Sequence, residues 1–155
     1  MLHSPSEYEI KLEETFNAFK DIKAHRISGP GATDVECIYS GMKFNVEAKS
    51  TSNKLGGLNR GRIEDHMNKT KANYTLVIAP DFAPAVYKSD IRNSSISVLE
   101  TGVFCEYVMS QYFSMGRENL EYKELHELIM QNLGENITSK VSERNPMIFG
   151  LDKKI

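Results

Sequence analysis

The sequence predicts an α/β fold in which a mixed central sheet is flanked by helices, and two patterns indicate it. Val35–Tyr39 and Phe44–Lys49 each alternate apolar and more polar residues, and the turn residues Ser40-Gly41 separate them, which favours a β-hairpin. Farther on, the continuous apolar run Tyr74–Ala79 suits a strand that is buried on both faces. Strands and helices that alternate along a chain are typical of such a layered fold.

Helical periodicity surrounds these strands. Leu12, Phe16 and Phe19 recur at helical spacing, so an amphipathic helix is expected from about Glu7 to Ile22. The remaining expected elements are a short strand at 24–28, the hairpin strands, a Gly-rich loop at 54–60, a helix at 61–72, the strand 74–79, a short helix at 84–91, a short strand at 96–99, and helices around 104–113 and 125–133. The core order is therefore α-β-β-β-α-β, and the tail after Pro146 is expected to be loosely held.

Length and charge restrict the organisation and the function. A chain of 155 residues fits a single domain, here predicted as a core of about residues 7–100 followed by a helical part of about 101–145. The formal net charge is -2, whereas proteins that hold nucleic acid unaided usually carry a basic surplus. This charge balance predicts weak unaided affinity for DNA.

The cellular setting is predicted from the two cysteines and the N-terminus. Cys37 and Cys105 lie in apolar stretches and are expected to be buried free thiols, which predicts a reduced, cytoplasmic setting. The first residues contain no apolar signal-peptide region, and no apolar run approaches the roughly 20 residues that span a bilayer. No membrane association is expected.

One acidic-x-Lys triplet, Glu47-Ala48-Lys49, lies on a strand pattern. Four other triplets of this kind lie on helical or terminal segments, where they are most simply solvated charges. Residues two apart on a strand point to the same side, so Glu47 and Lys49 project together while Val46 and Ala48 pack inward. Asp34 begins the preceding strand, and pairing brings it within a few ångströms of Glu47. Two carboxylates and a lysine then converge at one end of the sheet.

This arrangement predicts a Mg²⁺-dependent phosphodiester hydrolase. Adjacent carboxylates raise each other's pKa unless a cation shares the site, and oxygen ligands suit Mg²⁺, for which Mn²⁺ is expected to substitute. The metal would lower the pKa of its bound water and neutralise charge in the transition state. Lys49 would orient that water or stabilise the developing charge. The alternative interpretation is an ordinary solvent-facing strand whose charges happen to be neighbours.

Asp34 followed by Glu47-Ala48-Lys49 after a hairpin resembles the PD-(D/E)xK nuclease superfamily, although Ala32-Thr33 replaces the usual proline before Asp34. The α-β-β-β-α-β order is similar to the core of that superfamily, the restriction-endonuclease-like core. The resemblance implies Asp34, Glu47 and Lys49 as catalytic residues, and Asp34, Glu47 and the backbone carbonyl of Ala48 as metal ligands. Many members also bind metal through an acidic residue of the first helix. Glu9 resembles that residue, and Glu13 is its competitor.

A closer resemblance extends through about Tyr107. Leu58-Asn59-Arg60-Gly61-Arg62 leads into a helix, the run Tyr74–Ala79 follows, and Ser95–Leu99 then leads into another helix. This succession looks like the cleavage domains of type IIS restriction endonucleases, the FokI-like group. The resemblance implies double-strand cleavage by two nuclease domains, each of which cuts one strand.

A locally basic stretch beside the predicted site offers contacts to DNA phosphates. The candidates for DNA binding are Lys54, Arg60, Arg62, His66 and Lys69. Glu64 and Asp65 interrupt the stretch, so a solvated helix face is the alternative. No Cys or His spacing predicts a zinc site, and no phosphate-binding glycine motif predicts a nucleotide cofactor.

Three functions are considered. The first is the small cleavage subunit or cleavage domain of a type IIS restriction enzyme, because the chain, taken to begin at Met1, leaves no room for a separate sequence-reading domain. Such a subunit would bind double-stranded DNA together with a larger DNA-recognising, strand-nicking partner. The second is a Holliday-junction resolvase, against which the absence of a basic surplus argues. The third is a non-enzymatic DNA- or protein-binding module on the same fold.

Overall fold

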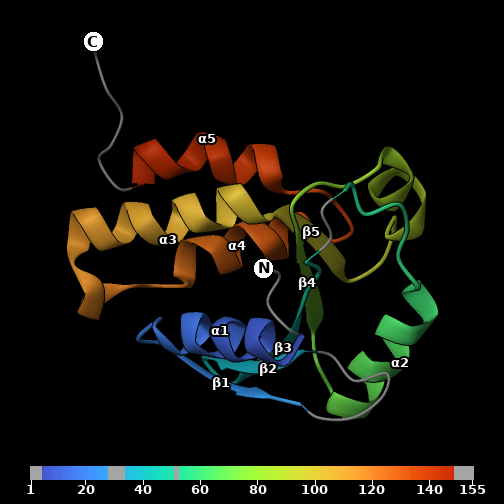
Figure 1. The fold of residues 1–155 in the computed structure, drawn as a ribbon, viewed down its shortest axis with the longest axis horizontal. Helices are drawn as coiled ribbons and strands as arrows, with labels where there is room; N and C mark the ends of the chain where they lie inside the picture. The colour runs from blue at the N-terminus through green and yellow to red at the C-terminus, as the bar shows by residue number, and fades with distance from the viewer. Residues whose placement is uncertain (1–4, 28–33, 51–52, 149–155) are drawn as a thin grey trace.

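The computed structural model describes residues 5–27, 34–50 and 53–148 (Figure 1). Its elements are α1 (Pro5–Asn17), β1 (Ile22–Arg26), β2 (Val35–Tyr39), β3 (Met42–Ala48), α2 (Arg60–Thr70), β4 (Tyr74–Ala79), a π-helical turn η1 (Val86–Asp90), β5 (Ile96–Glu100), α3 (Thr101–Met115), a 3-10 turn η2 (Arg117–Asn119), α4 (Lys123–Gln131) and α5 (Thr138–Ile148). The expected α-β-β-β-α-β order from the first helix to the buried apolar strand is confirmed.

A five-stranded mixed sheet organises the chain, as predicted. The strand order is β1-β2-β3-β4-β5; β1 pairs with β2 and β2 with β3 in antiparallel orientation, whereas β3 pairs with β4 and β4 with β5 in parallel orientation. The predicted hairpin joins β2 to β3, and its turn residues Ser40 and Gly41 have positive φ values of 50° and 78°. A two-residue turn with positive φ at both positions matches the twist of paired strands. This turn fixes the register that places Val35 opposite Val46.

Helices cover both faces of the sheet, and alternation along the strands divides the core. Leu76 and Ile78 of β4 pack in a cluster with residues of α1, α3, α4 and α5, whereas Val77 and Ala79 pack in a second cluster with α2 and η1. In Figure 1, α1 lies against β2 and β3, and α3, α4 and α5 form a stack that is separate from α2. The prediction that the strand Tyr74–Ala79 is buried on both faces is confirmed.

The first helix is shorter than predicted, ending at Asn17 instead of Ile22. The Asn17 side-chain amide donates to the carbonyl oxygen of Ala24 and its oxygen accepts from the Ala24 N–H, both at 2.8 Å. The Lys20 N–H donates to the Leu120 carbonyl at 2.9 Å. These hydrogen bonds provide partners for backbone N–H and C=O groups in the turn that follows α1. Phe19 lies in this turn, outside the helix, and its side chain is buried in the core.

The C-terminal part holds a helix, α5, that the sequence patterns did not predict. Val98 of β5 donates its N–H to Glu135 and accepts from Ile137, so the segment before α5 pairs with the edge of the sheet. Asn136 Oδ1 then accepts from the backbone N–H and the hydroxyl of Thr138, which supports the first residue of the helix. The helix continues two residues past Pro146 to Ile148, whereas the rest of the tail that was expected to be loosely held, 149–155, lies outside the described residues.

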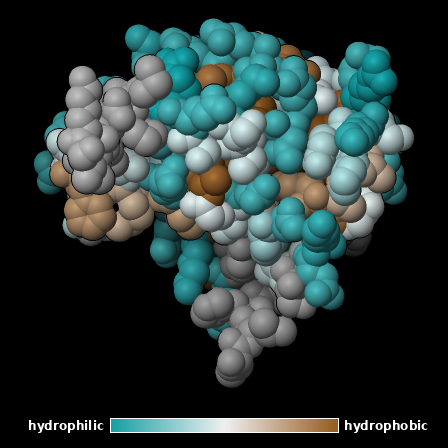
Figure 2. Space-filling model, turned by 90° about the horizontal axis from the view of Figure 1, so that it is seen from above, coloured by the Kyte–Doolittle hydropathy of each residue, from teal (hydrophilic) through white to brown (hydrophobic). Residues whose placement is uncertain are grey.

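The two thiols differ in environment. Cys37 is buried and free as predicted, and burial raises its pKa. Cys105 is exposed on α3, so its predicted burial is wrong. Exposed apolar or aromatic side chains also lie toward the end of α3, and pale-brown surface is visible at that end of the molecule in Figure 2: Met109, Tyr112, Phe113 and Met115. Among the described helices, none has the length and apolar character needed to cross a membrane.

Candidate active site

The hairpin brings Asp34 to the strand that carries Glu47 and Lys49. Asp34 directly precedes β2, and the pairing of Val35 with Val46 puts it opposite Glu47. Its Oδ2 accepts a 2.8 Å hydrogen bond from the Ala48 N–H. A strand residue directs its N–H and C=O to the same side, so the Ala48 carbonyl also faces the Asp34 edge. The carboxylate and this carbonyl therefore lie at one strand end.

Glu47 is buried on the face of β3 that α2 covers, with 3% of its surface exposed. Asn45, two residues earlier, points to the same face and donates from Nδ2 to Thr70 Oγ1 at 3.1 Å. Val46 packs in the core on the opposite face. The predicted alternation of inward and site-facing residues along this strand is therefore confirmed for Glu47 and Val46.

Arg62 of α2 is the partner of Glu47. Its Nη2 donates to Oε1 at 2.8 Å and to Oε2 at 3.1 Å. Asn59, the N-cap of α2, accepts from the Arg62 N–H at 3.1 Å, which fixes the first turn of the helix above the strand. A buried carboxylate without a compensating cation is strongly destabilising, so the Arg62 guanidinium stabilises Glu47 in this position.

Three charged side chains act on Asp34. Burial raises its pKa above the ordinary value, the Ala48 N–H opposes this, the charges of Glu47 and Glu9 raise the pKa further, and Lys49 lowers it. Lys49 follows β3, and its N–H donates to the Ile78 carbonyl at 2.8 Å, so its position is fixed by β4. The predicted catalytic residues are therefore close together, and Glu9 belongs to the same electrostatic environment.

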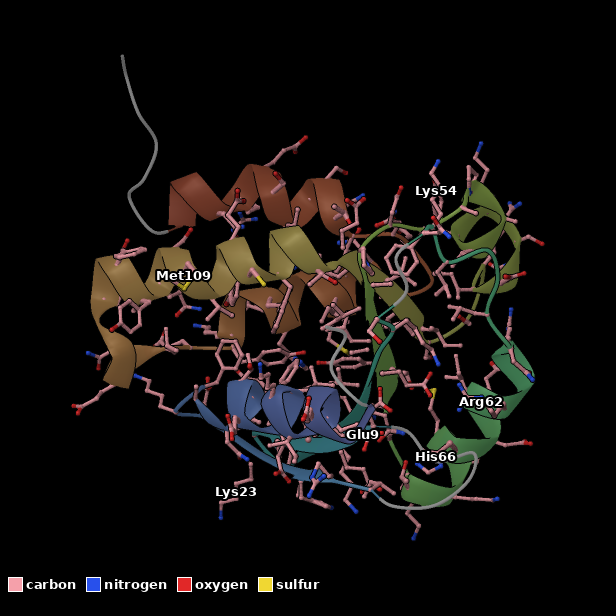
Figure 3. The ribbon with its side chains drawn as sticks, viewed as in Figure 1. Glu9, Lys23, Lys54, Arg62, His66 and Met109 are labelled. Carbon is pink, nitrogen blue, oxygen red and sulfur yellow. The ribbon has the colours of Figure 1, made fainter. Side chains whose placement is uncertain are left out.

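The structure distinguishes the two first-helix glutamates. Glu13 Oε2 accepts from the Arg26 N–H at 2.7 Å, and its Oε1 lies 3.9 Å from the Arg26 guanidinium, so this side chain links α1 to the edge strand β1. Glu9, one turn earlier, lies in the N-terminal half of α1 (Figure 3), close enough for its charge to raise the pKa of Asp34. Glu9 is therefore the better placed of the two for the predicted site, although its metal-binding role stays a prediction.

The five predicted DNA-binding residues do not lie together. Arg60 donates to Glu64 at 3.1 Å and to the Arg92 carbonyl at 2.7 Å, which ties α2 to the turn before β5. His66 lies one helical turn after Arg62, and its buried Nε2 has no hydrogen-bond partner among the described residues. Lys69 is exposed in the last turn of α2. Lys54 is exposed and lies near η1 in Figure 3, away from Glu9, Arg62 and His66.

The donor atoms fit a hard divalent cation that retains water ligands. Among the described residues, no group of three His, Cys, Asp or Glu side chains forms a ready-made metal cage. The site instead offers two carboxylates, Asp34 and Glu47, and a backbone carbonyl. The pKa of Asp34 is raised by burial and by neighbouring negative charge, a cost that a cation would remove. Mg²⁺ characteristically binds through one or two carboxylates and keeps several waters.

Comparison with known proteins relates this chain to a restriction enzyme. The chain is 38% identical over 145 residues to the type II restriction enzyme HgaI of Avibacterium volantium. The match covers 92% of this chain, and the chain spans 29% of the length of HgaI. No family model matches the chain. The chain is thus similar to a segment of a type II restriction enzyme.

Sequence reasoning assigned Arg62 only to DNA and missed its contact with Glu47. The two residues are 15 positions apart, and no local pattern connects a strand residue to a helix residue across a loop. One signal was available: Arg62 and His66 lie four apart, next to Ile63 and Met67, which are also four apart and are buried. That spacing indicates a helix side turned towards the sheet.

Proposed function

We propose that this chain is the DNA-cleaving part of a type II restriction enzyme and that Asp34, Glu47 and Lys49 hydrolyse the phosphodiester bond. The observation that carries the proposal is the hydrogen bond from the Ala48 N–H to Asp34, because it joins one carboxylate to the strand end that bears the other two residues. The similarity to HgaI supports the class of enzyme. Membership of the PD-(D/E)xK superfamily is part of the same proposal.

Each residue has a separate role in the proposed reaction. Asp34, Glu47 and the Ala48 carbonyl would hold Mg²⁺, with Mn²⁺ as a substitute, and Glu9 would contribute to the same site. When bound, the ion supplies charge neutralisation at the phosphate and a water of lowered pKa. Lys49 holds the attacking water or stabilises the negative charge that develops on the phosphate. Burial of Glu47 at 3% exposure limits competing water and strengthens these electrostatic interactions.

DNA phosphates are proposed to approach along α2. Arg62 and His66 are one helical turn apart on the side that faces the strand bearing Glu47, and Lys69 extends the basic surface to the last turn. Arg60 has a structural role in holding the helix against the Arg92 carbonyl, so its contact with DNA is secondary. Lys54 would meet a more distant phosphate. These contacts are independent of base sequence, since phosphates carry no sequence information.

Target recognition is assigned to another part of the enzyme. The formal net charge of -2 supplies little of the phosphate neutralisation on which unaided DNA binding depends. The chain aligns with 29% of HgaI, which supports a larger enzyme that contains additional regions. We therefore propose a type IIS arrangement in which each copy of the nuclease site cuts one strand and a larger DNA-recognising, strand-nicking partner or region brings it to the target.

A plasmid assay tests the proposed function. Supercoiled plasmid is incubated with the purified chain in Mg²⁺, Mn²⁺ or EDTA, with and without the protein encoded by the neighbouring reading frame. The expected result is metal-dependent cutting that increases strongly when the partner is present. Cutting confined to four-way junctions would favour a junction resolvase instead. Absence of cutting in Mg²⁺ and in Mn²⁺, both with and without the partner protein, would refute the nuclease proposal.

A further inference from the structure

We propose that Arg62 is a resident cation on the Glu47 carboxylate, which a divalent metal replaces when a DNA phosphate draws the guanidinium away. Arg62 would then couple metal binding to DNA binding, so that the site loads its metal efficiently only on DNA. This inference rests on the proposed function, because it takes Glu47 to be a metal ligand.

The geometry of the contact between Arg62 and Glu47 is compatible with replacement of the guanidinium by a metal ion. One nitrogen, Arg62 Nη2, contacts both carboxylate oxygens, at 2.8 and 3.1 Å. The Glu47 side chain is 4% exposed, whereas the Arg62 side chain is 31% exposed. Arg62 is therefore the more exposed member of the pair, and its guanidinium covers part of the Glu47 carboxylate. The contact uses one nitrogen of the guanidinium and falls short of the two parallel bonds of a full bidentate pair.

Electrostatic repulsion makes it unfavourable for a metal ion and the Arg62 guanidinium to contact the Glu47 carboxylate at the same time. Asp34, Glu47 and Glu9 carry three formal negative charges, and Lys49 and Arg62 carry two positive ones, so these five groups sum to -1. Without Arg62 the sum is -2, which a divalent cation would neutralise. A metal that binds Glu47 while the guanidinium stays within hydrogen-bond distance is repelled at short range in a poorly solvated site. Removing the Arg62 charge should therefore strengthen metal binding in the absence of DNA.

A phosphate offers Arg62 an alternative partner. The guanidinium group matches phosphate oxygens in geometry, and the Arg62 side chain is 31% exposed, so a phosphate at the surface can reach it. Arg60, in the same helical turn, contacts Glu64 and the Arg92 carbonyl, whereas Arg62 contacts the Glu47 carboxylate. Arg60 is therefore a suitable control for a charge on this turn that does not pair with Glu47.

Calorimetric titration with Mn²⁺ at pH 8, without DNA, tests the first consequence. Arg62→Met keeps much of the side-chain length and removes the charge, while Arg60→Met is the matched control on the same turn. Arg62→Met should bind Mn²⁺ about tenfold more tightly than the wild type, within the usual range of site-to-site coupling. Arg60→Met should stay within about twofold, as expected for a charge paired elsewhere. An Arg62→Met affinity equal to or weaker than that of the wild type would overturn the proposal.

Binding of a short labelled duplex, measured by anisotropy with and without Ca²⁺, tests the coupling itself. Ca²⁺ should tighten duplex binding by the wild type by about tenfold, and this enhancement should shrink to less than about twofold in Arg62→Met. Equal enhancement in both proteins would contradict the exchange. Circular dichroism melting curves establish that the variants are folded.

Glu47→Gln separates failure of this inference from failure of the proposed function. Mn²⁺ binding that disappears in Glu47→Gln, yet is equal in the wild type and Arg62→Met, would overturn the role of Arg62 and leave the nuclease site intact. Failure of Mn²⁺ to bind the wild type and both arginine variants would overturn the metal site and the inference together.

Discussion

The Ala48 N–H donates a 2.8 Å hydrogen bond to the carboxylate of Asp34, which lies one residue before β2. The side chain thereby occupies the place of the next backbone acceptor in the β2–β3 ladder. The position of the carboxylate thus follows from the hairpin register, which the turn at Ser40-Gly41 sets. The Asp34 carboxylate thus contributes both to strand pairing and to the proposed metal site. Substitutions that keep or remove its hydrogen-bond acceptor should therefore distinguish its effect on stability from its effect on activity.

Asp34→Asn is expected to abolish cleavage and to raise the melting temperature by a few degrees. Asparagine keeps an oxygen that accepts from the Ala48 N–H, while the partly buried charge and its repulsion with Glu47 and Glu9 are lost. Asp34→Ala is the control, because it also removes the acceptor and should lower stability by about 1–2 kcal/mol. Calorimetry on both variants measures this, and a lower melting temperature in Asp34→Asn would contradict the electrostatic description.

The stability difference between Asp34→Asn and the wild type should depend on pH. Burial and nearby carboxylates raise the folded-state pKa of Asp34 above its ordinary value of 3.8. At pH values between 3.8 and the raised folded-state pKa, the folded protein binds more protons at Asp34 than the unfolded protein does. The contribution of Asp34 to stability therefore falls as pH rises through this range. The advantage of the variant should grow as pH rises above about 3.8 and become constant once pH exceeds the raised folded-state pKa of Asp34. Urea unfolding at several pH values measures it, and a constant difference would count against the assignment.

Gln111→Ala should destabilise the fold by about 1–3 kcal/mol, because it leaves the Glu121 N–H without its partner, whereas the Glu121 carbonyl still accepts from the Tyr107 hydroxyl. The fully buried Gln111 side chain donates to the Glu121 carbonyl and accepts from the Glu121 N–H, both at 2.6 Å, which attaches α3 to the segment before α4. Gln131→Ala, at the exposed end of α4, is the matched control and should change stability by less than about 0.5 kcal/mol. Chemical denaturation compares the two, and similar losses would refute the specific role of Gln111.

Gly134→Ala should cost about 2–3 kcal/mol, combining left-handed backbone strain with close contacts. Gly134 has φ 81°, and an added Cβ would lie 3.1 Å from the Ile91 carbonyl oxygen and 3.2 Å from that of Ser94. Gly102→Ala is the control, since Gly102 lies in α3 with no atom within 4 Å of an added Cβ; it should gain about 0.5 kcal/mol from helix propensity. Thermal melts of both variants decide, and a stabilised Gly134→Ala would contradict the geometry.

Local patterns predicted the features that depend on neighbouring residues. The turn at Ser40-Gly41 and strand alternation predicted both the hairpin and the face on which Glu47 lies, because both are set within a few residues. The approach of Asp34 to Glu47 followed from the same register. The catalytic and metal-binding roles of these residues stay predictions, since they concern chemistry beyond the fold.

The features that the sequence patterns did not predict depend on how the helices pack against the rest of the fold. The pairing of Arg62 with Glu47 depends on how α2 lies on the sheet, which no spacing within α2 specifies. Helix α5 buries few side chains, among them Val141 and Asn145, so its apolar periodicity is weak. Cys105 lies in an apolar stretch, but it occupies the exposed side of α3, and composition alone did not reveal that orientation.

Cleavage by the chain fused to an unrelated sequence-specific DNA-binding domain tests the proposed active site most directly, because the fusion supplies target recognition. A plasmid with paired binding sites is incubated with the fusion in Mg²⁺, and the products are mapped. The wild-type fusion should cut beside the paired sites, and Lys49→Met or Asp34→Asn should reduce the rate at least about 100-fold, as for loss of a group that stabilises transition-state charge. Undiminished cutting by both variants, or no cutting by the wild-type fusion, would contradict the proposed site.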